Sequence, residues 1–306
     1  MAISRNQLVK ELEPGLNALF GLEYKRYENQ HSEIYNEESS DRAFEEEVML
    51  SGFANAQVKG EGSGVSFDEA QETFTARYTH ETVALAFAIT EEAIEDNLYD
   101  RLASRYTKAL ARSMSNAKEV KGAAPLNNGL PAIAAGTAFQ TGDGVNLFST
   151  AHPTIAGTVA NTLATQADLN ETSLEQSLID IDAMTDERGL RIAAKGVKMI
   201  IPSANQFNAE RLMKSQGRTQ TADNDINAIN SMGMIPQGYR VNNFLTDSDS
   251  WYVITDVPNG MKMFSRTPLS TSMEGDFDTG NVRYKARERY SFGVSDYRGI
   301  FGVEGA

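Results

Sequence analysis

The most regular hydrophobic pattern in the chain lies between Thr90 and Lys121, where small or apolar residues recur every three or four positions. This stripe contains Ile94, Leu98, Leu102, Tyr106, Ala109, Ser113 and Ala117, and it is widened by Leu110 and Met114. Such spacing places these side chains on one face of a helix. Thr90 can cap the first turn, and Gly122 is a typical stop signal. The pattern predicts one helix over residues 90–121, about 45 Å long.

Two weaker patterns precede this helix. Leucines with roughly helical spacing occur at the start of the chain: Leu8, Leu12, Leu16 and Leu19. Pro14-Gly15 interrupts them, so short helical pieces in an N-terminal arm are predicted. Residues 48–89 contain two extended runs on either side of the glycine cluster KGEGSGV. These runs predict a long hairpin with a flexible tip.

The second half of the chain predicts mixed helices and strands. Residues 122–170 are rich in Gly, Ala, Asn and Thr, and they are predicted to be mostly loop. A capping box at Ser173–Gln176 predicts a helix that ends at Gly189, and another at Ser203–Gln206 predicts a helix that ends at Gly217. The apolar run VKMIIP between them predicts a buried strand. This order favours layers of α and β structure.

The last predicted strand, residues 281–293, has two different faces. Its apolar face comprises Val282, Tyr284, Ala286, Tyr290 and Phe292, with Glu288 as the exception. Its other face carries a basic ribbon that comprises Arg283, Lys285, Arg287 and Arg289. The ribbon could be a solvated face, could contact DNA, or could pair with an acidic stretch on the same chain or a neighbour.

The charge balance and the residue types reduce the number of possible functions. The chain has 28 basic and 42 acidic side chains, a net charge of −14, and a local net of −7 falls within the acidic stretch Glu28–Glu47. A dedicated nucleic-acid binder should be basic, so this class is not favoured. No cysteine is present, which excludes disulfides, a thiolate nucleophile and cysteine-ligated metal. We found neither a secretory signal nor an apolar run of membrane length, and we expect a soluble, intracellular chain with no membrane partner.

Signals for catalysis are weak. The three histidines are His31, His80 and His152. Ser149 precedes His152 in FSTAHPT, which suggests a serine hydrolase, but the G-x-S-x-G elbow is missing, so a histidine that orders a loop is the simpler interpretation. The tip GEGSGV lacks the third glycine and the lysine of phosphate loops. We therefore predict no catalytic residue, no cofactor and no metal, and hold an acid-based hydrolase or lyase as an alternative.

The order of these parts resembles the major capsid proteins of tailed bacteriophages. The likeness is strongest to the Mu-like major head subunit family, in which a segment like DGVNLFSTAHP (residues 143–153) follows the long helix. The ending DTGNVRYKARERYSFGVSDYRGIFG also resembles the last strand of that family. The resemblance implies an α+β chain with the tailed-phage and herpesvirus capsid fold.

The same resemblance implies a division of the chain. Its expected parts are an N-terminal arm at 1–44, an extended loop that reaches over a neighbouring subunit at 45–89, a peripheral domain at 90–202 with a spine helix at 90–121, an axial domain at 203–260, and returning strands at 261–306. Some relatives crosslink a loop lysine to an asparagine next door. Lys59 lies in the right region, although no matching asparagine or acid can be chosen.

The implied function is assembly into hexamers and pentamers of an icosahedral shell around a double-stranded DNA genome. The implied partners are other copies of the chain and portal, scaffolding or decoration proteins, with weak or indirect DNA contact. The implied location is the virion capsid, assembled in the cytoplasm of the bacterial host. An acidic subunit fits a shell that encloses DNA without immobilising it. The shell of a protein-only nanocompartment is the nearest alternative.

Overall fold

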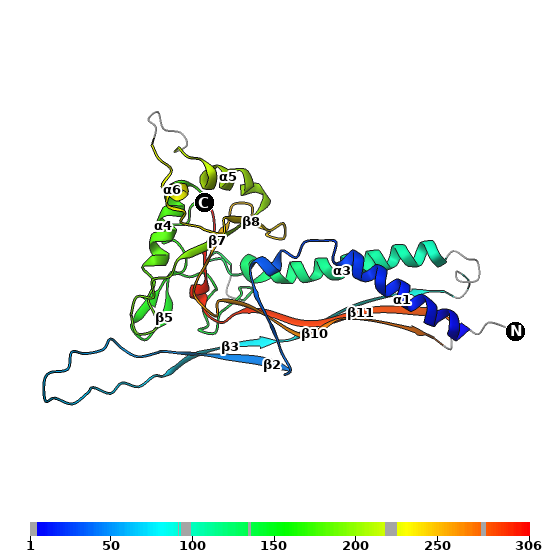
Figure 1. Ribbon diagram of the computed structural model, residues 1–306, viewed down its shortest axis with the longest axis horizontal. Helices are drawn as coiled ribbons and strands as arrows, with labels where there is room; N and C mark the ends of the chain where they lie inside the picture. The colour runs from blue at the N-terminus through cyan, green and yellow to red at the C-terminus, as the bar shows by residue number, and fades with distance from the viewer. Residues whose placement is uncertain (1–4, 91, 93–98, 134–135, 218–224, 277–279) are drawn as a thin grey trace.

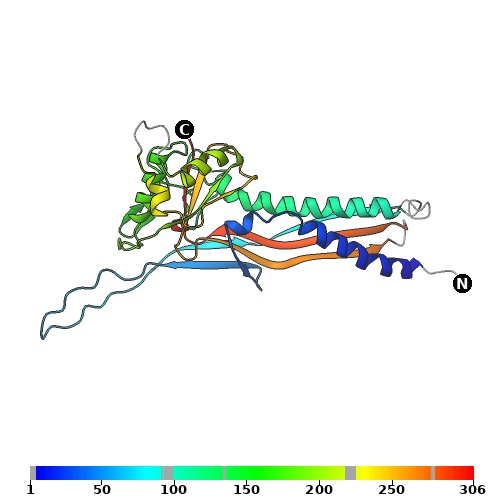
Figure 2. The same ribbon diagram turned by 45° about the horizontal axis from the view of Figure 1, so that its top comes forward.

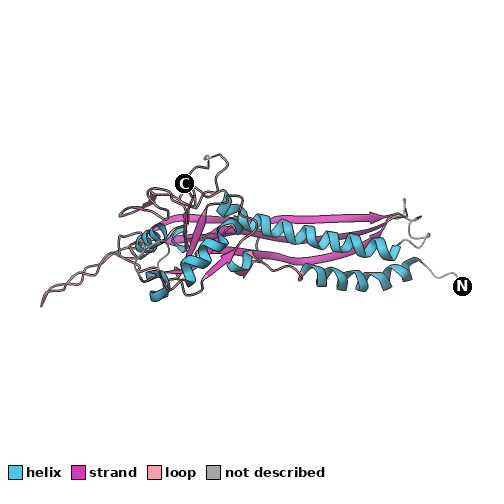
Figure 3. Cartoon of the chain, turned by 90° about the horizontal axis from the view of Figure 1, so that it is seen from above, coloured by secondary structure: helices cyan, strands magenta, loops and turns pink. Residues whose placement is uncertain are grey.

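The computed structural model describes residues 5–90, 92, 99–133, 136–217, 225–276 and 280–306. It has three parts: an elongated platform of strands and two helices, a compact lobe at one end, and a hairpin that projects beyond the lobe (Figure 1). Figures 2 and 3 show the same three parts from other sides. Among the described residues no helix is long and apolar enough to cross a membrane.

The platform is a four-stranded sheet with the order β1-β10-β11-β4. Its strands are β1 (Asn36–Ser39), β10 (Met261–Gly275), β11 (Val282–Val294) and β4 (Glu81–Ile89). The helices α1 (Arg5–Tyr24) and α3 (Tyr99–Asn127) lie over one face of this sheet (Figures 1 and 2). Leu16, Phe20, Leu110 and Met114 from these helices pack on Tyr284 of β11. The apolar face predicted for the last strand is therefore confirmed.

Both helices differ from the prediction in length. α1 is one continuous helix that contains Pro14, because packing on α3 and the sheet outweighs one lost backbone hydrogen bond. α3 does not stop at Gly122 but continues through Pro125 to Asn127. Gly122 serves close packing instead, since a Cβ there would lie 2.9 Å from the Cβ of His31. Residues 91 and 93–98, within the predicted first turns, lie outside the described residues.

The projecting hairpin consists of β2 (Phe44–Leu50) and β3 (Glu72–Thr79), which pair in antiparallel register. Residues 51–71 form its long tip, which has no regular strands and turns at the glycine cluster (Figure 1). The predicted hairpin over 48–89 is too long by one strand, because β4 pairs with β11 of the platform. An apolar strand gains more from a partner in a large sheet than from an isolated two-stranded hairpin.

The lobe is built on a second sheet with the order β12-β9-β7-β8. Its strands are β7 (Gly196–Ile201), β8 (Tyr239–Val241), β9 (Trp251–Thr255) and β12 (Ile300–Val303). The lobe also contains the helices α4 (Glu171–Asp182), α5 (Gln206–Lys214) and α6 (Ala228–Met232) and the short pair β5 (His152–Thr154) and β6 (Gly157–Val159). Short 3-10 turns occur at η1 (His31–Glu33), η2 (Ser203–Asn205) and η3 (Tyr297–Gly299). The predicted mixture of layers is confirmed.

The caps of the lobe helices correct the prediction. Asn170, not Ser173, caps α4: its side chain accepts from the Ser173 backbone N–H, and the Ser173 hydroxyl oxygen accepts from the Asn170 backbone N–H. This helix ends at Asp182, seven residues before the predicted Gly189. Ser203 makes no capping bond, and it opens a 3-10 turn ahead of α5. That helix ends at Lys214 rather than Gly217.

The platform and the lobe join where two chain segments cross. Residues 256–260 lead from β9 into β10, and residues 295–299 lead from β11 into β12. Gly260 and Gly299 meet at this crossing, and a Cβ on Gly299 would lie 2.3 Å from the Cα of Gly260. No larger residue fits at either position without moving a backbone.

Candidate functional site

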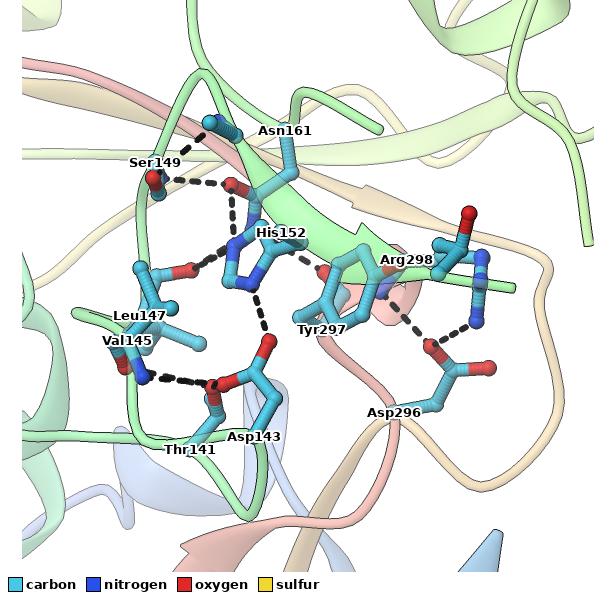
Figure 4. A network of polar contacts seen from close by, with 12 residues as sticks. Thr141, Asp143, Val145, Leu147, Ser149, His152, Asn161, Asp296, Tyr297 and Arg298 are labelled. Atoms are coloured by element: carbon cyan, nitrogen blue, oxygen red, sulfur yellow. Dashed lines mark hydrogen bonds and ion pairs between the residues drawn. The ribbon is translucent and has the colours of Figure 1, made fainter. Parts of the chain in front are cut away.

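Two segments far apart in the sequence pack face to face between the lobe and the platform: residues 143–153 and 295–302. His152 lies flat on Tyr297, with ring centroids 3.8 Å apart and planes inclined by 7°. The guanidinium carbon of Arg298 lies 4.6 Å from the centre of the same ring. Figure 4 shows Tyr297 between the other two side chains. We call these three buried residues and their hydrogen-bond partners the junction site.

Both ring nitrogens of His152 are engaged. Nδ1 lies 2.6 Å from Asp143 Oδ2, and Nε2 lies 3.2 Å from the Leu147 carbonyl oxygen and 3.1 Å from Asn161 Oδ1. All three neighbours are oxygen acceptors, and they approach the ring at both of its nitrogens. His152 thereby ties a loop together from three sides, and the sequence interpretation of a loop-ordering histidine is confirmed.

Ser149 is not a partner of this histidine. Its Oγ accepts a hydrogen bond from the Ala151 backbone N–H at 3.1 Å, and its own N–H donates to Asn161 Oδ1 at 2.9 Å. A nucleophilic serine requires a hydrogen bond to its base. This arrangement therefore gives the serine-hydrolase alternative no nucleophile–base pair at these two residues.

Asp143 is held as a carboxylate. Its Oδ1 accepts from the Val145 N–H at 3.1 Å and from the Thr141 hydroxyl, while Oδ2 faces His152 (Figure 4). Burial by itself would raise the pKa of Asp143, but the hydrogen bonds from His152 and Thr141 outweigh it and lower that pKa below 3.8. A charged acid is thus stable under the lobe because both of its oxygens accept hydrogen bonds.

Asn161 connects the two segments, and no sequence signal singled it out. Its Nδ2 donates to the carbonyl oxygens of Leu147 at 2.7 Å and Tyr297 at 3.1 Å. Its Oδ1 accepts from Ser149 and His152, and the side chain is fully buried. One amide therefore satisfies backbone groups of both segments, which a hydrophobic residue of the same size cannot do.

Arg298 anchors the far side of the junction site. Its Nη2 lies 2.6 Å from Glu187 Oε1, its Nε donates to the Thr185 carbonyl oxygen at 2.9 Å, and its Nη1 lies 3.3 Å from Asp296 Oδ1. Burial raises the pKa of Asp296, and Arg298 partly opposes this shift. The guanidinium therefore holds the lobe loop at residues 185–187 against the crossing segment.

A family model described as phage capsid protein matches residues 72–303, which run from β3 to the end of β12. The chain belongs to this family. It is a capsid shell protein with a structural rather than an enzymatic role, and its place is the virion capsid, where copies assemble into a shell. No curated protein matches the chain.

Solved capsid structures share the fold of this capsid protein. The capsid of an empty GTA particle has a TM-score of 0.59 at 13% identity and covers 92% of this chain and 91% of its own. The capsid of Myoviridae phage XM1 has a TM-score of 0.56 at 12% identity, with 89% of each chain covered. The capsid of cyanophage P-SCSP1u has a TM-score of 0.58 at 10% identity and covers 89% and 86%. At these identities the likeness establishes the fold.

The basic ribbon lies on the face of the platform opposite the helices. Arg283, Lys285 and Arg287 are exposed, while Arg289 is half-buried. Most of their neighbours across the strands are small, namely Ala84, Ala86 and Ala88 on β4 and Ser270 and Ser272 on β10, but Glu274 lies opposite Arg283. The predicted two-sided pattern is confirmed. One member of the ribbon, Arg283, is paired with Asp276.

The acidic stretch does not meet this ribbon within the described part of the capsid protein. Its carboxylates pair with other cations: Glu33 with Lys198 and Arg240, Glu38 and Glu47 with Lys262, Asp41 with Arg266, and Glu46 with Arg77. Burial alone would lower the pKa of Lys262, but its hydrogen bonds to Glu47 and Glu38 raise it. The expectation of pairing on the same chain is therefore wrong, because these cations lie nearer.

The other histidines join distant segments of the capsid protein. His31 Nδ1 lies 2.6 Å from Glu119 Oε1 on α3, and the same carboxylate accepts from the His31 backbone N–H at 2.9 Å. The two ring nitrogens of His80 lie 2.9 and 3.0 Å from the hydroxyls of Ser40 and Ser291. Burial and the nearby Arg289 hold the pKa of His80 below 6.5. All three histidines serve contacts between elements.

The glycine cluster and Lys59 lie exposed at the hairpin tip. Ser63 donates from its N–H and its hydroxyl to the Gly60 carbonyl oxygen, which closes a local turn. In the described part of the chain, no group of three or more acidic or histidine side chains is placed to hold a metal ion.

Proposed function

We propose that this shell protein is the major capsid protein of a Mu-like tailed phage, and that it forms hexamers and pentamers of an icosahedral shell around double-stranded DNA. The observation that carries the proposal is the family match together with the junction site. The two segments that resemble the Mu-like family, residues 143–153 and SDYRGIFG, are the two that pack on each other through His152 and Tyr297.

The proposed division follows the parts described above. Residues 1–44 are the N-terminal arm, 45–89 contain the extended loop, and 90–202 with 261–306 form the peripheral domain around α3 as spine helix. The axial domain falls within 203–260. Because the lobe sheet also includes β7 and β12, we propose that the axial unit extends beyond these limits on both sides.

The hairpin supports the proposal of contacts between subunits. Its tip presents large apolar side chains to solvent, with Val58, Val65 and Phe67 exposed by 100%, 67% and 97%. A two-stranded hairpin is marginal in water, so a neighbouring copy is the natural cover for such residues. Portal, scaffolding or decoration proteins, weak DNA contact and assembly in the host cytoplasm complete the proposal.

Electron microscopy of the purified protein tests this function. We expect closed shells of one diameter. When the shells are isolated from infected or induced cells, the DNA inside them should be protected from nuclease. Closed shells that never hold DNA would favour a nanocompartment. A single monomer peak in sedimentation at high concentration, with any scaffold supplied, would contradict assembly itself.

A further inference from the structure

An apolar groove of about 750 Å³ runs between α4 and α6 on the lobe. Leu178 and Ile229 are buried at its base, with 7% and 2% of their surfaces exposed. Ile179, Met232 and Met234 line it and are exposed by 61%, 69% and 37%. Three large apolar side chains open to water in one groove are typical of a surface that another protein covers. We call it the α4–α6 groove.

The rim of this groove carries three acids and one lysine. Glu175 and Asp182 lie on α4, one turn to either side of Ile179, and Asp256 and the exposed Lys195 complete the rim. Within the described residues none of these three carboxylates forms an ion pair with a cation. Along this face of α4, the apolar Ile179 therefore lies between two acidic side chains, Glu175 and Asp182.

α5 presents the complementary pattern on another part of the lobe. Phe207 is 73% exposed, and Arg211, also exposed, follows one turn later on the same face. Ala209 and Leu212 hold the opposite face of α5 in the lobe core. Arg211 forms no ion pair in the described part of the chain. An aromatic side chain next to a guanidinium without an ion pair matches an apolar groove edged by Glu175 and Asp182.

We propose that Phe207 of one copy docks into the α4–α6 groove of the next copy, with Arg211 against Glu175 or Asp182. α4 and α5 lie on different sides of the lobe (Figure 1), so one chain cannot join its own two surfaces. A contact between unlike surfaces of identical copies repeats head to tail, and closes a ring when the rotation permits. The inference rests on the proposed shell function, because it specifies how lobes meet within a ring.

Cysteine crosslinking tests the contact directly, since the chain has no cysteine of its own. The double variant Phe207→Cys with Ile179→Cys is assembled and oxidised, then separated under denaturing conditions without reductant. Crosslinked species that climb from two chains to a whole ring are expected, and the two single variants should give none. Shells that assemble from the double variant without crosslinks would overturn the inference and leave the shell function standing.

Charge reversal gives a second measurement that does not need cysteines. Arg211→Glu should raise the protein concentration required for assembly at least about tenfold, as expected for a buried contact at the centre of an interface. Combining it with Glu175→Lys and Asp182→Lys should restore part of the loss. Val120→Ala, at an exposed apolar position on α3, serves as the control and should change the concentration less than about twofold. If the combined variant assembles as poorly as the sum of the separate effects, the pairing of Arg211 with these acids is refuted.

Discussion

Replacing Asn161 with alanine should destabilise the subunit more than any surface change of the same kind. The alanine removes four bonds of 3.1 Å or less, two donated to Leu147 and Tyr297 and two accepted from Ser149 and His152. It also removes a longer bond to the Ile300 carbonyl oxygen at 3.4 Å, which we leave out of the sum. A net contribution of about 1 kcal/mol for each bond gives a loss of about 4 kcal/mol. Since domains are stable by about 5–15 kcal/mol, this is a large share.

Urea unfolding of the unassembled subunit measures this loss. Trp251 is the only tryptophan and is fully buried in the lobe, where its Nε1 donates to the Ala167 carbonyl oxygen at 3.1 Å, so its fluorescence reports unfolding of the lobe. With a slope of about 3 kcal/mol per molar urea, the midpoint should fall by about 1.3 M. Asn55→Ala, at an exposed position in the hairpin tip, is the matched control and should leave the midpoint unchanged.

A midpoint for Asn161→Ala within about 0.3 M of the wild type would refute the reasoning. It would mean that the carbonyl and N–H groups of the two segments find other partners once the amide is gone. A crystal structure of the variant shows whether His152 still stacks on Tyr297. If the stacking is intact and stability is lost, the loss comes from the missing hydrogen bonds alone.

Three further changes test the hairpin, the ribbon and one buried acid. Deleting Gly60–Gly64 should reduce shell yield while the urea midpoint of the subunit stays within error, and wild-type yield would contradict a role in contacts. Arg283→Glu with Arg287→Glu should lower assembly without loss of subunit stability, since both are exposed; equal losses of both would point to misfolding. Burial raises the pKa of Glu288 above 4.5, so the stability of the wild type falls as pH rises from about 4.5 through that pKa. Glu288→Gln has no such titration, and it should gain stability relative to the wild type across this range. A stability difference that stays constant between about pH 4 and pH 8 would refute this expectation.

The alternation along β11 was predictable because a period of two needs only local residue types. Glu288 looked like an exception on the apolar face, and it does lie on that face, 2% exposed and 3.6 Å from Lys118 of α3. The lysine that accommodates it is 170 positions away, so no local pattern could reveal the pair. The same holds for Lys262, whose partners Glu38 and Glu47 come from two other strands.

Glycine is a typical residue at the end of a helix, but Gly122 has a different role in this fold. Gly122 is at its position because α3 passes close to His31, and proximity between segments is invisible before the fold is known. Asn161 had no signal either, since a single asparagine in a Gly- and Thr-rich stretch is ordinary loop composition. The junction site was anticipated only through the two segments on which the family resemblance rested, and their mutual contact required the structure.

The crossing of Gly260 and Gly299 determines how force travels through one subunit. Two backbones in direct contact have no side chain between them that could change rotamer and absorb a displacement. We therefore expect a displacement of the lobe at this point to move β10 and β11 with it. A larger residue at either glycine would push the two segments apart, and we expect it to loosen the lobe from the platform in every copy of the shell.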